Sequence, residues 1–258
     1  MPDLAPVLCD LDGVIWLGDE PIAGAADAVA ALRAGGAVVL FVSNNSFAPI
    51  ADVEAKLARF DIPAQGDVLT SAQAGALLVQ PGERVVLCGG PGAAEALVAR
   101  GAVIVDEGPA DAVVVGFHRS FDYEELRRAT AVVRAGARLI GTNDDATYPT
   151  PDGPIPGGGS ILAAFATASG VTPIVAGKPY APMAALVRQR VGESAARAAL
   201  MVGDRPDTDG RFAVELGCRF GLVLSGVTHQ RDLPVTPTPT FVARDLAALA
   251  ERLIGGTG

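Results

Sequence analysis

Cysteine and histidine are scarce in this 258-residue sequence. Its three cysteines, Cys9, Cys88 and Cys218, lie far apart and form no Cys-x-x-Cys pair, and its only histidines are His118 and His229. An odd, scattered set of cysteines argues against a disulfide framework and is typical of reduced thiols in a cytoplasmic protein. Two isolated histidines are too few for a zinc site or a Ser-His-Asp triad.

Long apolar runs and excess positive charge are also missing. No apolar run reaches the roughly 18 residues of a membrane-spanning helix, and the N-terminus lacks the basic and apolar segments of a signal peptide. The net charge of −9 argues against nucleic acid or an anionic membrane as the main partner, because both need a basic face. A small anionic substrate is still compatible with this charge, since a pocket needs only local positive charge. We expect a cytoplasmic protein that acts on a small molecule.

Lysine is the rarest charged residue. Of the 20 basic residues only Lys56 and Lys178 are lysines. Because the chain uses arginine for generic positive charge, a lysine between Gly177 and Pro179 indicates a specific task. A compact ammonium fits between a carboxylate and a phosphate without the bidentate fork of arginine. Lys56 lies on a predicted helix among other charged residues, and we expect it to be solvated.

Alternation between β-branched runs and Ala-rich stretches dominates the chain. It predicts an α/β protein whose parallel strands are buried between helices in a doubly wound sheet. The predicted strands are 6–9, 37–42, 84–88, 102–105, 112–116, 138–141, 173–176, 199–202 and 220–224. The predicted helices are 24–34, 49–60, 71–79, 93–100, 122–135, 181–191 and 208–216, with another capped by Ser160 and a weak strand and helix near 240–253.

Two bodies are predicted within the chain. The pattern restarts after Pro81-Gly82, and a polar loop rich in glycine and proline runs from Thr142 to Gly159. We expect residues 1–79 and 174–258 to form one sheet-centred domain and residues 80–173 to be a smaller α/β domain inserted into it. Such an insertion is tolerated where the ends of the inserted segment lie close together.

Four predicted strands end in polar clusters. The clusters are Asp10-Leu11-Asp12-Gly13, Ser43-Asn44-Asn45, Gly177-Lys178-Pro179 and Gly203-Asp204-Arg205. In an open parallel sheet the ligand site lies outside the carboxyl ends of the strands. Carboxylates gathered there repel one another unless a cation joins them, and an all-oxygen donor set favours Mg²⁺. The lysine, hydroxyl and amide groups suit phosphoryl oxygens. The pattern therefore predicts a metal-assisted phosphoryl-transfer centre.

These four clusters, followed by Thr208 and Asp209, resemble in order the four motifs of the haloacid dehalogenase (HAD) superfamily. The resemblance extends over nearly the whole chain and implies a Rossmann-like core. The long interval between Ser43 and Lys178 is similar to that of the NagD-like, p-nitrophenylphosphatase-like and phosphoglycolate-phosphatase-like subclass, which carries an α/β cap there. Supporting strings are Val14-Ile15-Trp16-x-Gly18, Pro21-Ile22-x-Gly24-Ala25 and Leu224-Ser225-Gly226-Val227.

The resemblance implies roles for the two aspartates of the first motif. Asp10 would be the nucleophile that forms an aspartyl-phosphate, and its carboxylate would bind Mg²⁺. Asp12 would protonate the leaving alkoxide, later deprotonate the attacking water, and ligate the metal through its backbone carbonyl. Dehalogenases of the superfamily lack the second aspartate, so its presence favours phosphate esters as substrates.

The other motifs would supply the rest of the site. By resemblance, Ser43, Asn44 and the backbone of Asn45 would hold the phosphoryl oxygens. Lys178 would neutralise the nucleophile and phosphate, and Asp204 would be the third metal contact. Asp209 would orient Lys178 or a metal-bound water from behind the ligands.

Substrate choice would belong to the cap in this resemblance. Tyr148 stands where some relatives have a substrate-contacting histidine, so a hydroxyl would replace an imidazole there. Contact of Tyr148 with substrate and packing of its ring within its own loop are equal alternatives. Trp16 follows the first motif and either lines the entrance of the active site or packs in the interior of the protein.

The substrate itself is left open between phosphoglycolate, glycerol phosphate, sugar phosphates, nucleotides and pyridoxal phosphate, with a slight preference for a small polar leaving group. The alternatives to a phosphatase are an idle protein that binds phosphorylated metabolites and a phosphomutase. Relatives often pair through the cap, which makes a homodimer possible.

Overall fold

The computed structural model describes residues 4–148 and 153–255. The chain divides into two compact units. The first comprises residues 1–43, 53–69 and 187–258, and the second comprises residues 44–52 and 70–186. The predicted boundaries, 1–79 with 174–258 against 80–173, stay a prediction.

A six-stranded sheet forms the centre of the first unit, in the order β15-β14-β13-β1-β4-β5. The pairs β1·β13, β1·β4, β13·β14 and β14·β15 are all parallel. The strands are β1 (Val7–Cys9), β4 (Val39–Ser43), β5 (Val68–Thr70), β13 (Leu200–Gly203), β14 (Arg219–Val223) and β15 (Phe241–Ala243), and a small hairpin pairs β2 (Trp16–Leu17) with β3 (Glu20–Pro21).

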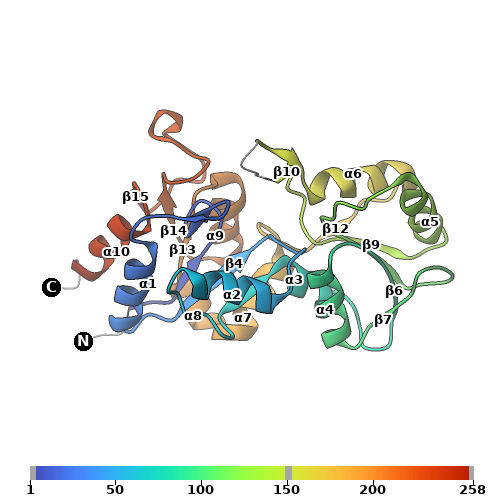
Figure 1. The fold of residues 1–258 in the computed structure, drawn as a ribbon, viewed down its shortest axis with the longest axis horizontal. Helices are drawn as coiled ribbons and strands as arrows, with labels where there is room; N and C mark the ends of the chain where they lie inside the picture. The colour runs from blue at the N-terminus through green and yellow to red at the C-terminus, as the bar shows by residue number, and fades with distance from the viewer. Residues whose placement is uncertain (1–3, 149–152, 256–258) are drawn as a thin grey trace. The chain divides into compact units, whose positions relative to one another are not determined.

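Strands β1, β4 and β13 are buried along their whole length, as the continuous apolar runs predict for parallel strands between helices. Helices α1 and α10 pack together beside this sheet (Figure 1). The helices of this region are α1 (Ala25–Ala34), α2 (Ile50–Arg59), α7 (Ala181–Val191), α8 (Glu193–Ala198), α9 (Arg211–Leu216) and α10 (Leu246–Gly255). Of these, α2 and α7 run from one unit into the other.

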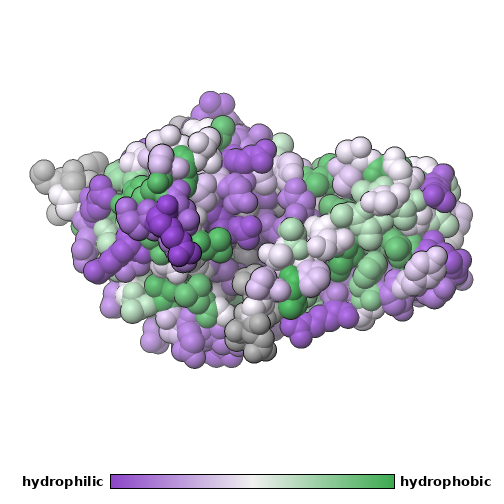
Figure 2. Space-filling model, turned by 90° about the horizontal axis from the view of Figure 1, so that it is seen from above, coloured by the Kyte–Doolittle hydropathy of each residue, from purple (hydrophilic) through white to green (hydrophobic). Residues whose placement is uncertain are grey.

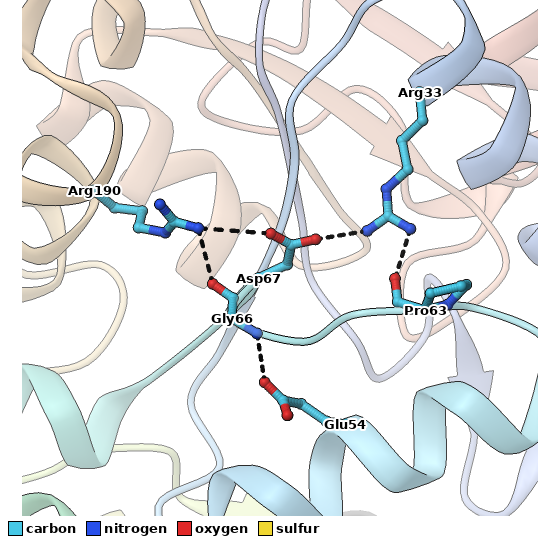
Figure 3. A network of polar contacts seen from close by, with 6 residues as sticks. All are labelled: Arg33, Glu54, Pro63, Gly66, Asp67 and Arg190. Atoms are coloured by element: carbon cyan, nitrogen blue, oxygen red, sulfur yellow. Dashed lines mark hydrogen bonds and ion pairs between the residues drawn. The ribbon is translucent and has the colours of Figure 1, made fainter.

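An ion-pair network anchors the segment that leads into β5. Figure 3 shows the Asp67 carboxylate between two guanidinium groups: Arg33 lies 2.9 Å away and Arg190 3.7 Å away. Arg190 also donates to the backbone oxygen of Gly66, whose N–H donates to Glu54 at 2.8 Å. The network thus joins α1, α2 and α7 to the start of an edge strand.

The second unit contains a parallel sheet of five strands in the order β12-β9-β8-β6-β7. Its strands are β6 (Arg84–Cys88), β7 (Val103–Ile104), β8 (Ala112–Val115), β9 (Arg138–Gly141) and β12 (Ile174–Val175), and a hairpin pairs β10 (Thr147–Tyr148) with β11 (Ile155–Pro156). Its helices are α3 (Ser71–Ala76), α4 (Pro91–Arg100), α5 (Tyr123–Arg134) and α6 (Gly158–Ser169).

Side chains of this sheet alternate between two cores. Cys88, Val113 and Leu139 pack with α5 and α6, whereas Val85 and Val114 pack with α3 and α4. This is the period of two expected for a sheet covered on both faces. The helix pairs lie on opposite sides of the sheet in Figure 1.

Two local predictions were wrong. Strand 173–176 was expected in the sheet of the 1–79 and 174–258 body, but β12 pairs with β9, with Ile174 opposite Ile140. The backbone N–H of Ala176 and Gly177 extend this pairing to Gly141 and Thr142, so the strand is fixed by the other sheet. Ser160 does not cap α6: the helix begins at Gly158, and the Ser160 hydroxyl donates to Ala146 instead.

Surface hydropathy is mixed on the face drawn in Figure 2, where green hydrophobic patches alternate with purple hydrophilic surface. Exposed large apolar side chains come from separate elements, such as Val98 on α4 and Val214 on α9. Single exposed apolar residues are ordinary for a folded protein. In the part of the chain that the structure describes, the helices are too short or too polar to cross a membrane.

Candidate active site

Three neighbouring strands of the first unit carry polar residues where they end. β1 lies between β13 and β4. Asp10 follows β1, Ser43 is the last residue of β4, and Asp204 follows β13. Because these strands are parallel, their carboxyl ends share one edge of the sheet. The sequence predicted that all four clusters would share this edge. The structure places three of the preceding strands in this sheet, whereas β12, which precedes Lys178, pairs with β9 in the other sheet.

Asp10, Asp204 and Asp209 form an acidic cluster at this edge. One carboxylate oxygen of each lies within 4.8 Å of the others. Asp204 and Asp209 are fully buried. Asp209 reaches the cluster because a π-helical turn, Pro206–Gly210, follows β13 and turns this residue inward. Its carboxylate accepts a hydrogen bond from the Arg205 N–H at 3.1 Å, which closes the turn.

The electrostatics of this cluster are unfavourable for a protein without a counter-charge. Burial, then the nearby Asp209 and Asp10 carboxylates, raise the pKa of Asp204 from 3.8 to about 8. The Val227 N–H donates to Asp204 Oδ2 at 2.6 Å and opposes that rise. Without a cation, Asp204 therefore keeps its proton near neutral pH, and ionisation of the whole cluster requires a positive charge beside it.

Glycines allow the backbone to approach these carboxylates. A Cβ on Gly226 would lie 2.0 Å from Asp204 Oδ2, and one on Gly203 would lie 2.1 Å from the Asp209 carboxyl carbon. Gly13 would clash with Asp204 in the same way and has a φ of +81°, which side chains rarely adopt. The supporting string Leu224-Ser225-Gly226-Val227 therefore builds one wall of the acidic cluster.

The donor set fits a hard divalent cation. Asp204 Oδ1 is buried and has no hydrogen-bond partner, whereas its Oδ2 is bonded to Val227. A buried carboxylate oxygen left unpaired is costly unless a ligand completes it. Carboxylate oxygens without nitrogen or sulfur are the donors that Mg²⁺ prefers.

Asp12 lies in the turn that follows Asp10, and its side chain is not part of the cluster. Its Oδ1 accepts a hydrogen bond of 2.9 Å from the indole Nε1 of Trp16. Trp16 is 5% exposed, which agrees with the interior packing proposed for it as one of two alternatives. Whether the Asp12 backbone carbonyl binds metal stays a prediction.

Lys178 and Asn44 belong to the second unit, and the Asn44 side chain forms hydrogen bonds with the backbone of Lys178. Asn44 Oδ1 accepts from the Lys178 N–H at 2.7 Å, and Asn44 Nδ2 donates to the Lys178 carbonyl and to Asp145 Oδ2, both at 3.0 Å. Lys178 is 1% exposed. A Cβ on Gly177 would lie 2.5 Å from Asn44 Oδ1, so this contact needs glycine. The Asn44 amide thus fixes the loop that carries the lysine.

Asn45 and Tyr148 make contacts within the second unit. Asn45 Oδ1 accepts from the N–H of Phe47 and of Ala48, which closes its own turn. The Tyr148 ring stacks on Phe117, with centroids 5.0 Å apart and an interplanar angle of 7°. Residues 149–152 of the polar loop that runs from Thr142 to Gly159 lie outside the described residues.

Sequence reasoning missed several polar partners. Asn143 Nδ2 and Ser71 Oγ both donate to the Asn44 carbonyl, at 2.8 and 2.7 Å. Asp145 accepts from the Asn44 amide. These residues come from segments about 30 and 100 positions away from Asn44. Each of these residues looks like an ordinary loop residue in its local sequence, so the sequence gives no sign that it contacts Asn44. The contacts become visible only in the folded structure.

The site belongs to the class of open α/β folds that bind ligands at the carboxyl edge of a parallel sheet, and its carboxylate donors suit a divalent cation. Comparison with known proteins narrows this class. A family model described as haloacid dehalogenase-like hydrolase matches residues 7–103, and a second model for HAD-like hydrolases matches residues 175–249. This chain belongs to the haloacid dehalogenase-like hydrolases.

Relatives of known activity match along most of the chain. The D-glycerol 3-phosphate phosphatase of Mycobacterium tuberculosis is 39% identical over 254 residues, which cover 94% of this chain and 70% of the relative. The acid sugar phosphatase of Staphylococcus saprophyticus is 35% identical, with coverage of 98% and 99%.

Solved structures are similarly close. The 4-nitrophenylphosphatase of Thermotoga maritima has a TM-score of 0.89 and 31% identity, with 97% of both chains covered. The M. tuberculosis glycerol phosphate phosphatase, solved in complex with magnesium, has a TM-score of 0.88 and 36% identity, covering 97% of this chain and 78% of the other. The predicted superfamily, subclass and fold class are confirmed.

Proposed function

We propose that this protein is a Mg²⁺-dependent phosphatase that hydrolyses a small phosphate monoester through an aspartyl-phosphate. The buried cluster of Asp10, Asp204 and Asp209 carries the proposal, because one of its oxygens, Asp204 Oδ1, lacks a partner. Magnesium held by Asp10 and Asp204 would supply positive charge to the phosphoryl oxygens and lower the repulsion between two anions.

The chain's own residues would carry out two displacements. In the first, a carboxylate oxygen of Asp10 forms a bond to phosphorus while the P–O ester bond breaks, and Asp12 gives its proton to the departing alkoxide. In the second, Asp12 takes a proton from water as that water attacks phosphorus. The bond to Asp10 breaks, inorganic phosphate leaves, and Asp12 is protonated again.

The remaining predicted residues would hold the phosphoryl group. We assign the Ser43 hydroxyl and the backbone after it to the phosphoryl oxygens, and the Lys178 ammonium to their charge. Support comes from the burial of both side chains and from the bonds by which Asn44, next to Ser43 in the chain, fixes Lys178. Asp209 would keep the metal ligands in place from behind.

The names of the relatives favour phosphates of small polyols and sugars as substrates. A small polar alcohol as leaving group is the preference that the sequence also gave. We place the reaction in the cytoplasm, where such metabolites occur. Contact between Tyr148 and substrate, and pairing of two copies through residues 80–173, are further proposals. The first predicts a higher KM for Tyr148→Phe, and the second a dimer mass in light scattering.

The test is hydrolysis of p-nitrophenyl phosphate and glycerol phosphate with Mg²⁺ or EDTA. We expect turnover only with the metal and its loss in Asp10→Asn. The matched control is Asp207→Asn, an aspartate of the same turn as Asp209 whose side chain is 72% exposed. Full turnover by Asp10→Asn would refute the nucleophile.

Two other results would favour the alternative functions. Metabolite binding without turnover across a broad panel of esters would indicate an idle binding protein. Transfer of labelled phosphate between sugars, rather than to water, would indicate a phosphomutase.

A further inference from the structure

The turn between Asp12 and Trp16 is closely bonded. The N–H groups of Ile15 and Trp16 both donate to the Leu11 carbonyl, at 2.8 and 3.2 Å, and the Gly13 N–H donates to the Trp16 carbonyl at 2.8 Å. The Ser225 hydroxyl donates to the Gly13 carbonyl at 2.7 Å. The backbone that carries both side chains is therefore fixed from two directions.

The ring of Trp16 is fixed as well. It is 5% exposed, and the Phe60 ring lies 6.1 Å from it between centroids. The Lys56 ammonium lies 4.4 Å from the centroid of the ring and donates to the Gly18 carbonyl at 2.6 Å. A buried indole that contacts both an aromatic ring and a cation has little freedom to turn, so its N–H keeps a constant direction.

That N–H points at one oxygen of Asp12. The distance from Nε1 to Oδ1 is 2.9 Å, an ordinary length for a hydrogen bond to a carboxylate. An indole N–H is a donor only, so it favours the unprotonated oxygen of a carboxylic acid. When Asp12 carries a proton, this contact therefore places the proton on Oδ2.

We propose that Trp16 is a positioning residue for the reaction: its indole N–H holds Oδ1 of Asp12, so that Oδ2 exchanges the proton with the leaving group. The inference rests on the proposed function, since it requires Asp12 to be the general acid. Trp16 touches neither the metal ligands of the acidic cluster nor the phosphoryl group in this scheme. It acts through the direction of one carboxyl oxygen.

Leaving-group dependence separates positioning from packing. A good leaving group such as p-nitrophenolate departs with little help from an acid, whereas a glycerol or sugar alkoxide needs its proton. Loss of the N–H therefore lowers kcat/KM more for alkyl esters than for p-nitrophenyl phosphate. General damage to the fold lowers both by the same factor.

Trp16 is the only tryptophan of the chain, which permits a nearly isosteric change at one site. Global replacement of tryptophan by β-(3-benzothienyl)alanine exchanges the N–H for sulfur and keeps the fused ring. We expect kcat/KM for glycerol phosphate to fall about tenfold further than for p-nitrophenyl phosphate, a fraction of what a general acid contributes. Trp16→Phe provides the same comparison by ordinary mutagenesis.

Two further variants decide the interpretation. Phe60→Leu loosens the packing of the ring but keeps its N–H, and we expect equal losses for both esters. Asp12→Asn tests the proposed function, because it should show the same preferential loss for alkyl esters, only larger. If Asp12→Asn shows that preference and the benzothienyl protein loses equally on both esters, the role of Trp16 is wrong while the phosphatase mechanism stands. If Asp12→Asn shows no preference, the assignment of the acid itself is wrong.

Discussion

The ammonium of Lys56 lies 4.4 Å from the centroid of the Trp16 ring, and the same group donates to Gly18 and to Asp19. Lys56 was expected to be solvated, and this was wrong. The helix that carries it, α2, places it over the β2–β3 hairpin, where the turn carbonyl and the indole face satisfy its charge. One of the two lysines thus serves the hairpin that contains Trp16.

We expect Lys56→Met to lower the free energy of unfolding by about 1 kcal/mol, because it keeps the aliphatic stem but removes the cation and its hydrogen bonds. Urea unfolding followed by Trp16 fluorescence measures the change. Arg59→Met, an exposed basic residue on the same helix, is the control and should change stability less. Equal effects of the two variants would show that the contact with Trp16 contributes nothing.

Metal binding should stabilise the protein measurably. Mg²⁺ offsets the repulsion among Asp10, Asp204 and Asp209, so the melting temperature is expected to rise with Mg²⁺ concentration. In Asp204→Asn that rise should disappear. Near pH 7 its melting temperature in EDTA should exceed that of the wild type by a few degrees, because asparagine replaces an acid that the folded state keeps protonated while the unfolded state has lost the proton. A wild-type response to Mg²⁺ in this variant would contradict the assignment of Asp204 as a ligand.

Without metal, the free energy of unfolding should decrease as the pH rises. The pKa of Asp204 is raised from 3.8 to about 8 by burial and by the neighbouring acids, so the folded state keeps a proton that the unfolded state has already lost. The free energy of unfolding therefore falls as the pH rises from about 4 to about 8 and levels off above that. The test compares the melting temperatures of the wild type and Asp204→Asn in EDTA over a range of pH. The difference between the two melting temperatures should vanish below pH 4. Saturating Mg²⁺ should weaken the trend.

Gly226 offers a test of the wall around Asp204. A Cβ there would lie 2.0 Å from Asp204 Oδ2, so Gly226→Ala must displace that carboxylate. We expect at least about tenfold weaker Mg²⁺ binding, because supporting contacts of metal ligands typically contribute 10–100-fold. Gly75→Ala, where the nearest atom would be 3.6 Å away, is the control. Calorimetric titration with Mg²⁺ measures both.

The Asp67 network should contribute to stability in a salt-dependent way. Asp67→Asn removes the charge that faces Arg33 and Arg190, and we expect a loss of about 1 kcal/mol that shrinks at high salt, since these groups are partly exposed. Asp52→Asn, an exposed aspartate on α2, controls for net charge. Chemical denaturation at low and high salt distinguishes the two variants.

The sequence predicted the long elements well because their apolar patterns are strong. Strand 84–88, strand 138–141 and helix 181–191 have the predicted bounds. The hairpins β2–β3 and β10–β11 were not predicted, since two-residue strands have no pattern of their own. Strand β5 and helix α8 were also missed, because short segments give too few residues for a period to show.

The sequence predicted which chemical groups gather at the candidate site, but not the turns and hydrogen bonds that hold those groups in place. Asp10 and Asp204 were expected together because both follow buried strands, and parallel strands end at one edge. The inward turn of Asp209 depends on a π-helical turn that no propensity indicates. Two hydrogen bonds depend on side-chain directions that only the folded backbone sets. One joins Trp16 to Asp12, and the other joins the Asn44 side chain to the backbone of Lys178.

The order of the central sheet has a consequence for synthesis. Strand β1, which leads to Asp10, is flanked by β13, which leads to Asp204 from the far end of the sequence. A growing chain on the ribosome therefore has Asp10, the proposed nucleophile, long before it has Asp204, the second proposed metal ligand. With these proposed roles, no ester is hydrolysed until β13, which begins at Leu200, has been synthesised and has paired with β1.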